Sequence, residues 1–329
     1  MTTPPATDLV AIDDIRVAAD RISKVAIRTP VLGVPAPDDL DDLLWCKAEG
    51  LQPSAAFKVR GAANKILRNL DTIRERGLVA ESSGNHARAV AYVARQLGVK
   101  AVIVMPDAAP APKIAAVRAL GAEVEIVTPA ERDTRPAELA DTHGYVRVPP
   151  YDDPDIIAGQ GTAGLELAVQ LPELATLLVP VSGGGLLSGV STAVKSLRPD
   201  VRVVGVEPEL AADAAEGFRT GQRATWTHAD TYRTVADGLR TTSVGVLPWA
   251  HITQYVDDII TVTEEQILAA MRHLVLAGRV IAEPSGAVAP AAWWFAREKV
   301  GGAGGVTAAV VSGGNVDPAL LSRVLADHG

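Results

Sequence analysis

Cysteine is nearly absent from this chain, since Cys46 is the only one among 329 residues. A single thiol cannot form a disulfide within the chain, and it cannot supply a cysteine-rich metal site. A fold stabilised by internal disulfides and a cysteine-rich metal protein are therefore both excluded.

Long apolar runs and an excess of positive charge are also missing. No window approaches eighteen consecutive apolar residues without a charge, so no membrane span is expected. Residues 1–8 have neither the basic nor the apolar segment of a secretory signal. The formal net charge of −8 argues against nucleic acid or an anionic membrane as the main partner. We therefore expect a cytoplasmic protein.

The composition that remains is that of a globular protein, with 48% hydrophobic and 21% charged residues. A chain of this length can form two domains or one large α/β unit. Apolar runs of strand length alternate with amphipathic segments, which predicts an α/β fold with parallel strands. The expected strands are 100–105, 123–127, 177–181, 201–206 and 307–311, and the expected helices are 113–120, 161–169, 264–276 and 316–325.

Two segments of the chain are candidate domain boundaries. Residues 145–154 are expected to cross between domains, because Pro149 and Pro150 cannot continue a helix or a central strand. A second boundary is expected near residues 76–77.

Lys58 is the first candidate for chemistry. It follows Ala55, Ala56 and Phe57 at the expected start of a helix. An amine among small and apolar residues loses hydration, so its pKa falls and it becomes a nucleophile toward a carbonyl. The common alternative is a solvated surface lysine.

A glycine turn, residues 182–186 (SGGGL), follows the expected strand 177–181 and precedes a helical segment. Glycines let backbone N–H groups converge, and a helix N-terminus adds positive potential, so the turn is a candidate phosphate cradle. It matches neither the Walker loop nor the Gly-x-Gly-x-x-Gly fingerprint. A flexible turn is the alternative.

Two further turns carry hydroxyl and amide groups. In residues 81–87, Ser83 can offer a hydroxyl to a reacting carbon and Asn85 can bond a ring hydroxyl, although helix capping is the commoner role. Ser312 ends an expected strand, where α/β proteins place ligands. It would be a neutral partner for a ring nitrogen, or simply part of a turn.

Taken in order, five motifs resemble the fold type II pyridoxal-phosphate enzymes of the serine/threonine dehydratase and serine racemase family. The resemblance runs from Arg28 to the C-terminus, and its motifs are 57–62 (FKVRGA), 82–86 (SSGNH), 158–162 (AGQGT), 182–186 and 312–315 (SGGN). It implies a tryptophan synthase β-like fold of two three-layer α/β/α domains with mostly parallel sheets. Residues 1–76 and 151–329 would form the large domain and residues 77–150 a smaller inserted one, with the active site in the cleft between them.

The resemblance also implies residue roles. Lys58 would form the Schiff base with pyridoxal 5'-phosphate and exchange a proton on one face of the substrate Cα, with Ser83 on the opposite face. Ser82, Ser83, Gly84 and Asn85 would receive the substrate carboxylate. The other implied cofactor-binding residues are Asn85, Ser182, Gly183, Gly184, Gly185, Leu186, Gly238, Glu283 and Ser312.

A divalent-metal site is expected in residues 207–213. Carboxylates at the first and seventh positions of a loop, with a carbonyl between them, suit Mg²⁺ or Ca²⁺. In racemase-like members of the family, a Glu, an Ala carbonyl and an Asp at this spacing bind such an ion. Glu207, Ala211 and Asp213 match, so Mg²⁺ is expected, with Ca²⁺ or Mn²⁺ as substitutes. The alternative is that Asp213 caps the following helix.

The implied reaction is dehydration of L-threonine or L-serine to 2-oxobutyrate or pyruvate plus ammonia. Serine at position 83 is shared with racemases and 3-hydroxyaspartate dehydratases, whereas many dehydratases have alanine there. Serine racemisation and threo-3-hydroxyaspartate dehydration therefore stay open, as do β-replacement and non-catalytic binding of a phosphate ligand. A homodimer is the family expectation.

Three departures from the family pattern stand out. Residues 54–56 are Ser-Ala-Ala where Thr-Gly-Ser is usual, Ser182 replaces a glycine, and Pro149 replaces a common histidine. The first removes a hydroxyl near Lys58 and so bears on substrate preference.

Overall fold

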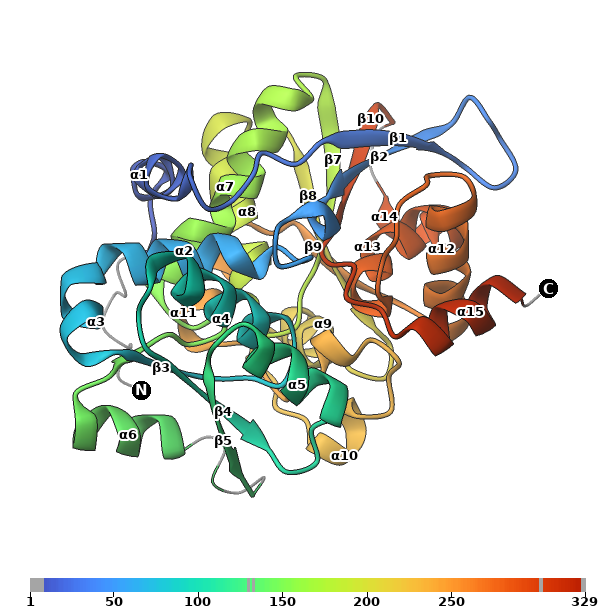
Figure 1. The fold of residues 1–329 in the computed structure, drawn as a ribbon. Helices are drawn as coiled ribbons and strands as arrows, with labels where there is room; N and C mark the ends of the chain where they lie inside the picture. Colours follow the sequence, from blue (N-terminus) through green and yellow to red (C-terminus); the bar gives the residue numbers. More distant parts are fainter. Residues whose placement is uncertain (1–8, 129–130, 132–133, 302–303, 327–329) are drawn as a thin grey trace.

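Two β-sheets with helices on both faces organise the chain (Figure 1). The computed structural model describes residues 9–128, 131, 134–301 and 304–326. All pairings in the two sheets are parallel except that of β1 with β2. The predicted α/β fold with mostly parallel sheets is confirmed.

The larger sheet has six strands in the order β1-β2-β10-β7-β8-β9. Its central strands are buried almost throughout, as expected for parallel strands covered on both faces. Sequence periodicity found three of the six and missed β1, β2 and β9. The bounds are β1 (Val31–Pro35), β2 (Leu43–Ala48), β7 (Leu174–Pro180), β8 (Arg202–Pro208), β9 (Asp258–Val262) and β10 (Val306–Val311).

The smaller sheet has four parallel strands in the order β5-β4-β3-β6. Its edge strand β6 lies inside the segment 145–154, which the sequence predicts only as a crossover. The strand stays short because the adjacent Pro149 and Pro150 have no N–H to donate. The bounds are β3 (Leu78–Glu81), β4 (Ala101–Pro106), β5 (Glu123–Val127) and β6 (Val146–Arg147).

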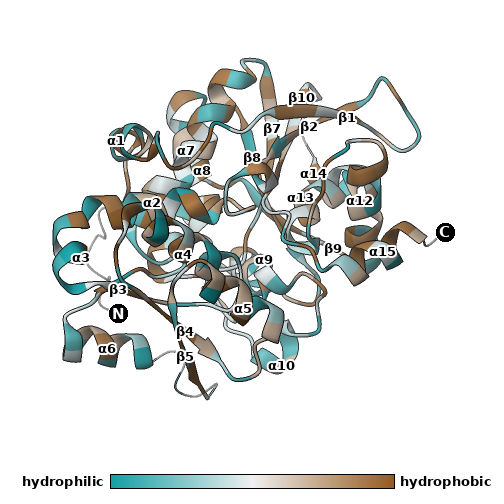
Figure 2. Ribbon diagram, viewed as in Figure 1, coloured by the Kyte–Doolittle hydropathy of each residue, from teal (hydrophilic) through white to brown (hydrophobic). Residues whose placement is uncertain are grey.

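Helices cover both sheets. The strands are rich in hydrophobic residues, whereas the outer helices α3 and α6 are largely hydrophilic (Figure 2). The helix predicted at 264–276 has the predicted ends, because Thr263 and Gln266 form a capping box at its start. The helices are α1 (Ile12–Ile22), α2 (Lys58–Arg68), α3 (Leu70–Arg76), α4 (Asn85–Leu97), α5 (Ala111–Ala119), α6 (Arg135–His143), α7 (Pro154–Gln170), α8 (Gly185–Leu197), α9 (Asp213–Thr220), α10 (His228–Thr231), α11 (Val246–Tyr255), α12 (Glu264–Leu276), α13 (Pro284–Phe295), α14 (Arg297–Val300) and α15 (Pro318–Ala326), with 3-10 turns η1 (Glu49–Leu51) and η2 (Asp237–Leu239).

The two sheets have separate cores, and α2 packs on the smaller one. The core of the four-stranded sheet includes Val59, Ala62 and Ile66 of α2 beside Leu78 and Ile103. Helix α2 therefore contacts the smaller sheet although it precedes residue 77. A domain division at residues 77 and 150 remains a prediction. None of the helices within the described ranges is long and apolar enough to cross a bilayer.

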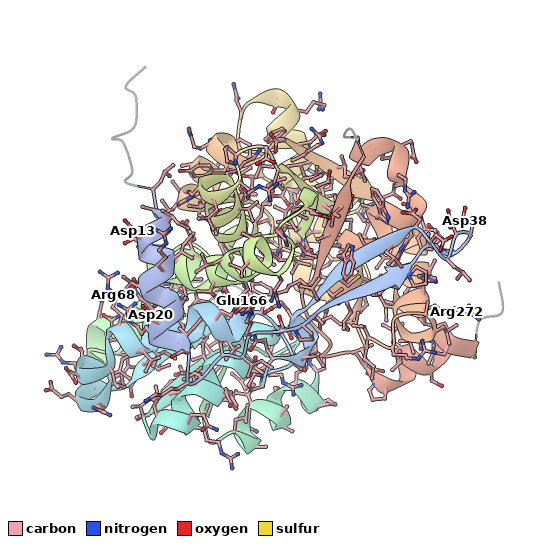
Figure 3. All side chains as sticks on the ribbon, turned by 90° about the horizontal axis from the view of Figure 1, so that it is seen from above. Asp13, Asp20, Asp38, Arg68, Glu166 and Arg272 are labelled. Atoms are coloured by element: carbon pink, nitrogen blue, oxygen red, sulfur yellow. The ribbon has the colours of Figure 1, made fainter. Side chains whose placement is uncertain are left out.

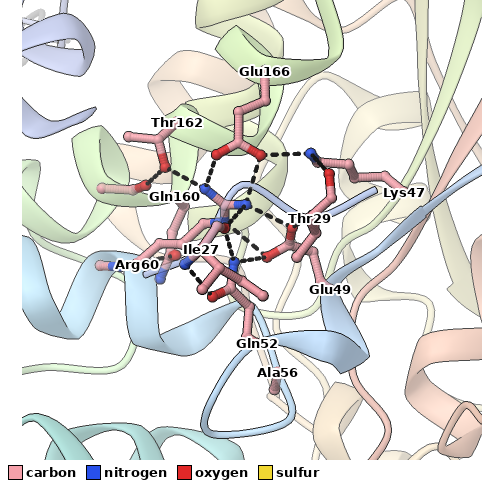
Figure 4. A network of polar contacts seen from close by, with 12 residues as sticks. Ile27, Thr29, Lys47, Glu49, Gln52, Ala56, Arg60, Gln160, Thr162 and Glu166 are labelled. Atoms are coloured by element: carbon pink, nitrogen blue, oxygen red, sulfur yellow. Dashed lines mark hydrogen bonds and ion pairs between the residues drawn. The ribbon is translucent and has the colours of Figure 1, made fainter. Parts of the chain in front are cut away.

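A buried ionic network fixes α2 to the larger sheet (Figure 4). Arg60 is 1% exposed and donates to both carboxylate oxygens of Glu49, each at 2.8 Å. It also donates to both oxygens of Glu166 on α7, at 2.7 and 2.9 Å. Lys47 of β2 donates to Glu166 and, at 2.8 Å, to the Thr29 carbonyl. The network thus joins β2, η1, α2 and α7.

The charges of this network depend on one another. Burial would raise the pKa of Glu49, but the charge and hydrogen bonds of Arg60 outweigh it and lower that pKa. Figure 3 draws Glu166 near the centre of the view and Asp13 and Asp38 at its edge, and the Glu166 side chain is 17% exposed against 83% for Asp13. Removing one partner from such a cluster leaves an uncompensated buried charge.

We predict that Arg60→Met destabilises the protein by about 3–5 kcal/mol, because Glu49 would be left buried without its cation. Denaturant unfolding of the two proteins would measure the loss. Arg16→Met is the matched control, because Arg16 forms an exposed pair with Asp13, and its loss should change stability little. Similar midpoints for the two variants would contradict the role assigned to the network.

Candidate active site

The candidate site lies where turns from both sheets meet. The turn after β10 contacts the segment before α2, because the Phe57 N–H donates to the Ser312 carbonyl at 3.0 Å. Asn85, at the start of α4, donates to Glu283, which caps α13. The Glu283 N–H in turn donates to the Gly313 carbonyl at 3.1 Å. These contacts bring three of the predicted motifs together near the carboxyl ends of β3 and β10, the usual ligand position in α/β sheets.

Lys58 is the first residue of α2, and its side chain is half-buried. Its Nζ donates to the carbonyl of Pro150 at 2.7 Å and lies 5.1 Å from the centre of the Phe57 ring. Burial lowers the pKa of the amine to about 8. The predicted loss of hydration is therefore present, and a substantial fraction of the amine is neutral near pH 8.

The glycine turn has the form of a phosphate cradle. It joins β7 to the 13-residue helix α8, and Gly184 has a left-handed φ of 88°. A Cβ on Gly183 would lie 2.4 Å from the Tyr151 ring, and one on Gly184 would lie 2.8 Å from Pro248. Only glycine fits at these two positions, which keeps the N-terminus of α8 open for an anion.

Two residues that depart from the family pattern, Ala55 and Ser182, have a left-handed backbone conformation. Ala55 and Ser182 both have φ of 58°, a region that residues other than glycine rarely adopt. The Ala55 carbonyl accepts from the Gly314 N–H at 2.9 Å. Ser182 Oγ lies 3.3 Å from the Gly238 carbonyl and 3.1 Å from Thr241 Oγ1. Each strained residue is therefore held by contacts to a neighbouring turn.

The groups assigned to the cofactor ring form a connected set. Buried Ser312 donates to the Ser285 carbonyl at 3.3 Å, and Ser285 Oγ accepts from the Gly238 N–H at 2.9 Å. Burial, and secondarily the charge of Asp237, raises the pKa of Glu283 to about 7. Ser312 thus offers the predicted neutral hydroxyl.

The Ser82–Asn85 turn precedes α4 and faces open space. Gly84 donates to Ser82 Oγ at 3.1 Å, and a Cβ on Gly84 would meet no atom within 4 Å. The N-cap residue is Gly84, so side-chain capping by Ser83 or Asn85 is not the function of this turn. The N-terminus of a 13-residue helix beside free space suits a carboxylate.

Sequence reasoning missed several neighbours of these groups. Asn315 donates to Asn85 Oδ1 at 2.7 Å. The only sequence feature that pointed to Asn315 was its position in the motif 312–315. His86 is buried, with Nε2 2.8 Å from the Val148 carbonyl and Nδ1 without a partner. Burial, together with the charge of Lys58, lowers the pKa of His86 to about 3. His86 is therefore a neutral neighbour of the lysine.

The predicted metal ligands lie around the loop between β8 and α9. Glu207 and Asp213 are each 1% exposed, and Glu207 Oε1 and Asp213 Oδ2 have no hydrogen-bond partner. Burial and the nearby Asp213 raise the pKa of Glu207, and burial raises that of Asp213 to about 7. The N-cap of α9 is Ala212, so the capping explanation for Asp213 is wrong. Glu207 Oε2 accepts from the Ala215 N–H at 2.8 Å. The two unpartnered oxygens, Glu207 Oε1 and Asp213 Oδ2, beside the buried Ala211 fit a hard divalent cation.

No group of three His, Cys, Asp or Glu side chains in the described part of the chain is arranged to hold a metal. A cation at Glu207 and Asp213 would therefore need the Ala211 carbonyl and water as further ligands.

Known proteins resemble this chain over nearly its whole length. A family model described as "Pyridoxal-phosphate dependent enzyme" matches residues 22–313. The L-threo-3-hydroxyaspartate ammonia-lyase of Saccharomyces cerevisiae is 39% identical, over 92% of this chain and 93% of that protein. The catabolic L-threonine dehydratase of Escherichia coli is 36% identical, over 96% of each. The structure of maize serine racemase has a TM-score of 0.87 at 35% identity, over 98% of each chain.

The described residues fit the cofactor of this family. The open α8 N-terminus suits its phosphate, the lysine of lowered pKa suits its aldehyde, and the neutral Ser312 suits its ring nitrogen. The chain belongs to the pyridoxal-phosphate-dependent enzymes, among dehydratases, ammonia-lyases and racemases that act on amino acids.

Proposed function

We propose that the protein is a threonine/serine dehydratase that converts L-threonine to 2-oxobutyrate and L-serine to pyruvate, releasing ammonia. The observation that carries the proposal is the pairing of a partly neutral, half-buried Lys58 with a neutral Ser312 at the same site. When bound, the cofactor supplies an electron sink for the pair released at the substrate Cα. A serine does not enforce protonation of the ring nitrogen as a carboxylate would, which favours expulsion of the β-hydroxyl.

The chain's own groups have the following proposed roles. Lys58 carries the cofactor and moves the Cα proton, and the α4 N-terminus binds the substrate carboxylate. The α8 N-terminus binds the phosphate. The hydroxyl leaves the substrate as water, and a later hydrolysis gives the 2-oxo acid and ammonia. The proposed cofactor-binding residues remain Lys58, Asn85, Ser182, Gly183, Gly184, Gly185, Leu186, Gly238, Glu283 and Ser312.

Substrate preference is tested with a panel of L- and D-serine, L-threonine and 3-hydroxyaspartate, following both 2-oxo acid formation and substrate chirality. We expect L-threonine and L-serine to give the highest kcat/KM for 2-oxo acid formation. A higher value with 3-hydroxyaspartate would move the assignment to the ammonia-lyase that resembles this chain. Accumulation of an unsaturated intermediate that is consumed by added thiol would instead indicate β-replacement.

We predict that Lys58 in cofactor-free protein reacts with acetylating reagents at a rate that rises as the pH passes through about 8. Only the neutral amine is nucleophilic, and the lowered pKa brings it into this form well below the value of about 10.4 for an ordinary lysine. Mass spectrometry of the Lys58 peptide measures the rate, with a short lysine peptide as control. Equal midpoints for peptide and protein would contradict the desolvated environment.

Racemisation of serine is a second candidate function, favoured by Ser83 in a turn that faces open space. A hydroxyl on the face opposite Lys58 can return a proton from that side. We predict that Ser83→Ala lowers racemisation by at least about tenfold while elimination falls much less, since an acid/base group typically contributes 10²–10⁴-fold. The test follows chirality and 2-oxo acid in the same reaction. Equal losses in both would refute the opposite-face role.

A divalent cation, Mg²⁺ before Ca²⁺ or Mn²⁺, is proposed to bind at Glu207, Ala211 and Asp213. In the metal-free protein the pKa values of both carboxyls are raised, so their ionisation destabilises the fold, and for Asp213 this loss is complete as the pH rises through about 7. We therefore predict that Mg²⁺ stabilises the protein more at pH 8 than at pH 5.5, by about 2–3 kcal/mol at roughly a hundredfold excess over Kd.

Thermal unfolding with and without Mg²⁺ measures this effect. Asp213→Asn should abolish it, whereas Asp39→Asn, in an exposed loop, should leave it unchanged. Stabilisation that survives Asp213→Asn would place the ion elsewhere.

A homodimer in the cytoplasm is the proposed working form. Leu51 and Ile281 are 55% and 54% exposed, and a Cβ placed on Gly50, the residue before Leu51, would lie 3.3 Å from the Ile281 carbonyl oxygen. Exposed apolar side chains that lie together favour a subunit contact. Light scattering of the purified protein decides between one and two copies.

A further inference from the structure

An ion pair joins the two sheets at the rim of the site. Lys113 of α5 contacts the Asp237 carboxylate of η2, and each side chain is 38% exposed. Helix α5 packs on the core of the four-stranded sheet through Ile114 and Val117 (Figure 1). On the other side, Leu239 of η2 packs in the core of the six-stranded sheet. The pair is therefore an exposed link between the two cores, in addition to the buried Arg60 network and the Asn85–Glu283 contact.

The Asp237 end of this pair belongs to a loop that contacts both sides of the cofactor site. The Gly238 N–H donates to Ser285 Oγ at 2.9 Å, beside Ser312. The Gly238 carbonyl and Thr241 Oγ1 lie 3.3 and 3.1 Å from the Ser182 hydroxyl, at the start of the glycine turn. A movement of Asp237 would therefore reach the phosphate turn and the ring-side residues.

We propose that Lys113 and Asp237 are positioning residues that form a latch: the pair forms when the four-stranded unit closes over bound substrate and breaks to release product. The inference rests on the proposed dehydratase function for its substrate. A pair this exposed shifts an equilibrium only by a few-fold, so it can open in every catalytic cycle. The buried Arg60 network cannot do so, because breaking it would leave buried charges unpaired.

The charge-pair variants of the holoenzyme test the latch. We expect Lys113→Met and Asp237→Asn each to raise KM about twofold to fivefold with kcat within about twofold, and the double variant to be no worse than either. The charge swap, Lys113→Asp with Asp237→Lys, should restore most of the affinity. Raising the salt concentration should increase KM of the wild type but not of Lys113→Met. Lys100→Met is the matched control, since Lys100 pairs at 3.4 Å with Glu123 within the four-stranded sheet.

A second measurement needs no turnover. Hydroxylamine removes lysine-bound cofactor when it gains access, and loss of the cofactor's absorbance follows the reaction. Lys113→Met and Asp237→Asn should accelerate this loss a few-fold, and the charge swap should reverse it. Additive single effects in KM, or unchanged hydroxylamine access in both single variants, would overturn the latch. If no hydroxy amino acid is turned over, the proposed function fails while the hydroxylamine measurement still decides the latch.

Discussion

The bidentate contacts of Arg60 with Glu49 and Glu166 are the constraint on which the site depends. They hold the first turn of α2 against η1 and α7, and that turn begins at Lys58. A buried guanidinium between two carboxylates has one low-energy arrangement, because any displacement leaves an ion unpaired in a medium of low dielectric. Lys58, to which we assign the cofactor, is therefore positioned by charges on the far side of its own helix.

The rest of the site is built from backbone at the carboxyl ends of strands. The glycine turn ends β7, Ser312 follows β10, and the open turn with Ser82 and Gly84 follows β3. Each turn exposes N–H groups or small hydroxyls, and two of them start long helices whose N-termini favour anions. The substrate and cofactor of an amino acid dehydratase both carry anionic groups, so this arrangement matches the proposed chemistry. The two sheets supply different parts of the site, so contacts between the sheets determine how these parts are placed relative to one another.

The sequence predicted the motifs well because each depends on short-range chemistry. The glycine turn could be identified from its strand, its glycines and its helix alone, and the structure shows that Cβ atoms there would clash with Tyr151 and Pro248. The lowered pKa of Lys58 followed from its apolar neighbours. Short strands were harder to predict from the sequence, because a strand of two residues such as β6 has no periodicity to detect. The assignments of individual site residues to cofactor, substrate and metal remain predictions.

What the sequence determined by itself was the fold class, the family and the local geometry of the turns, since these follow from local periodicity, from the order of short motifs along the chain and from residues within each turn. Only the tertiary structure decided which distant groups meet. Lys58 donates to the carbonyl of Pro150, which lies 92 positions away in the chain. The Asn315–Asn85 hydrogen bond spans 230 positions, and the Lys113–Asp237 pair spans 124. Periodicity carries no information about such pairs, because packing of the two sheets and the burial it causes select them.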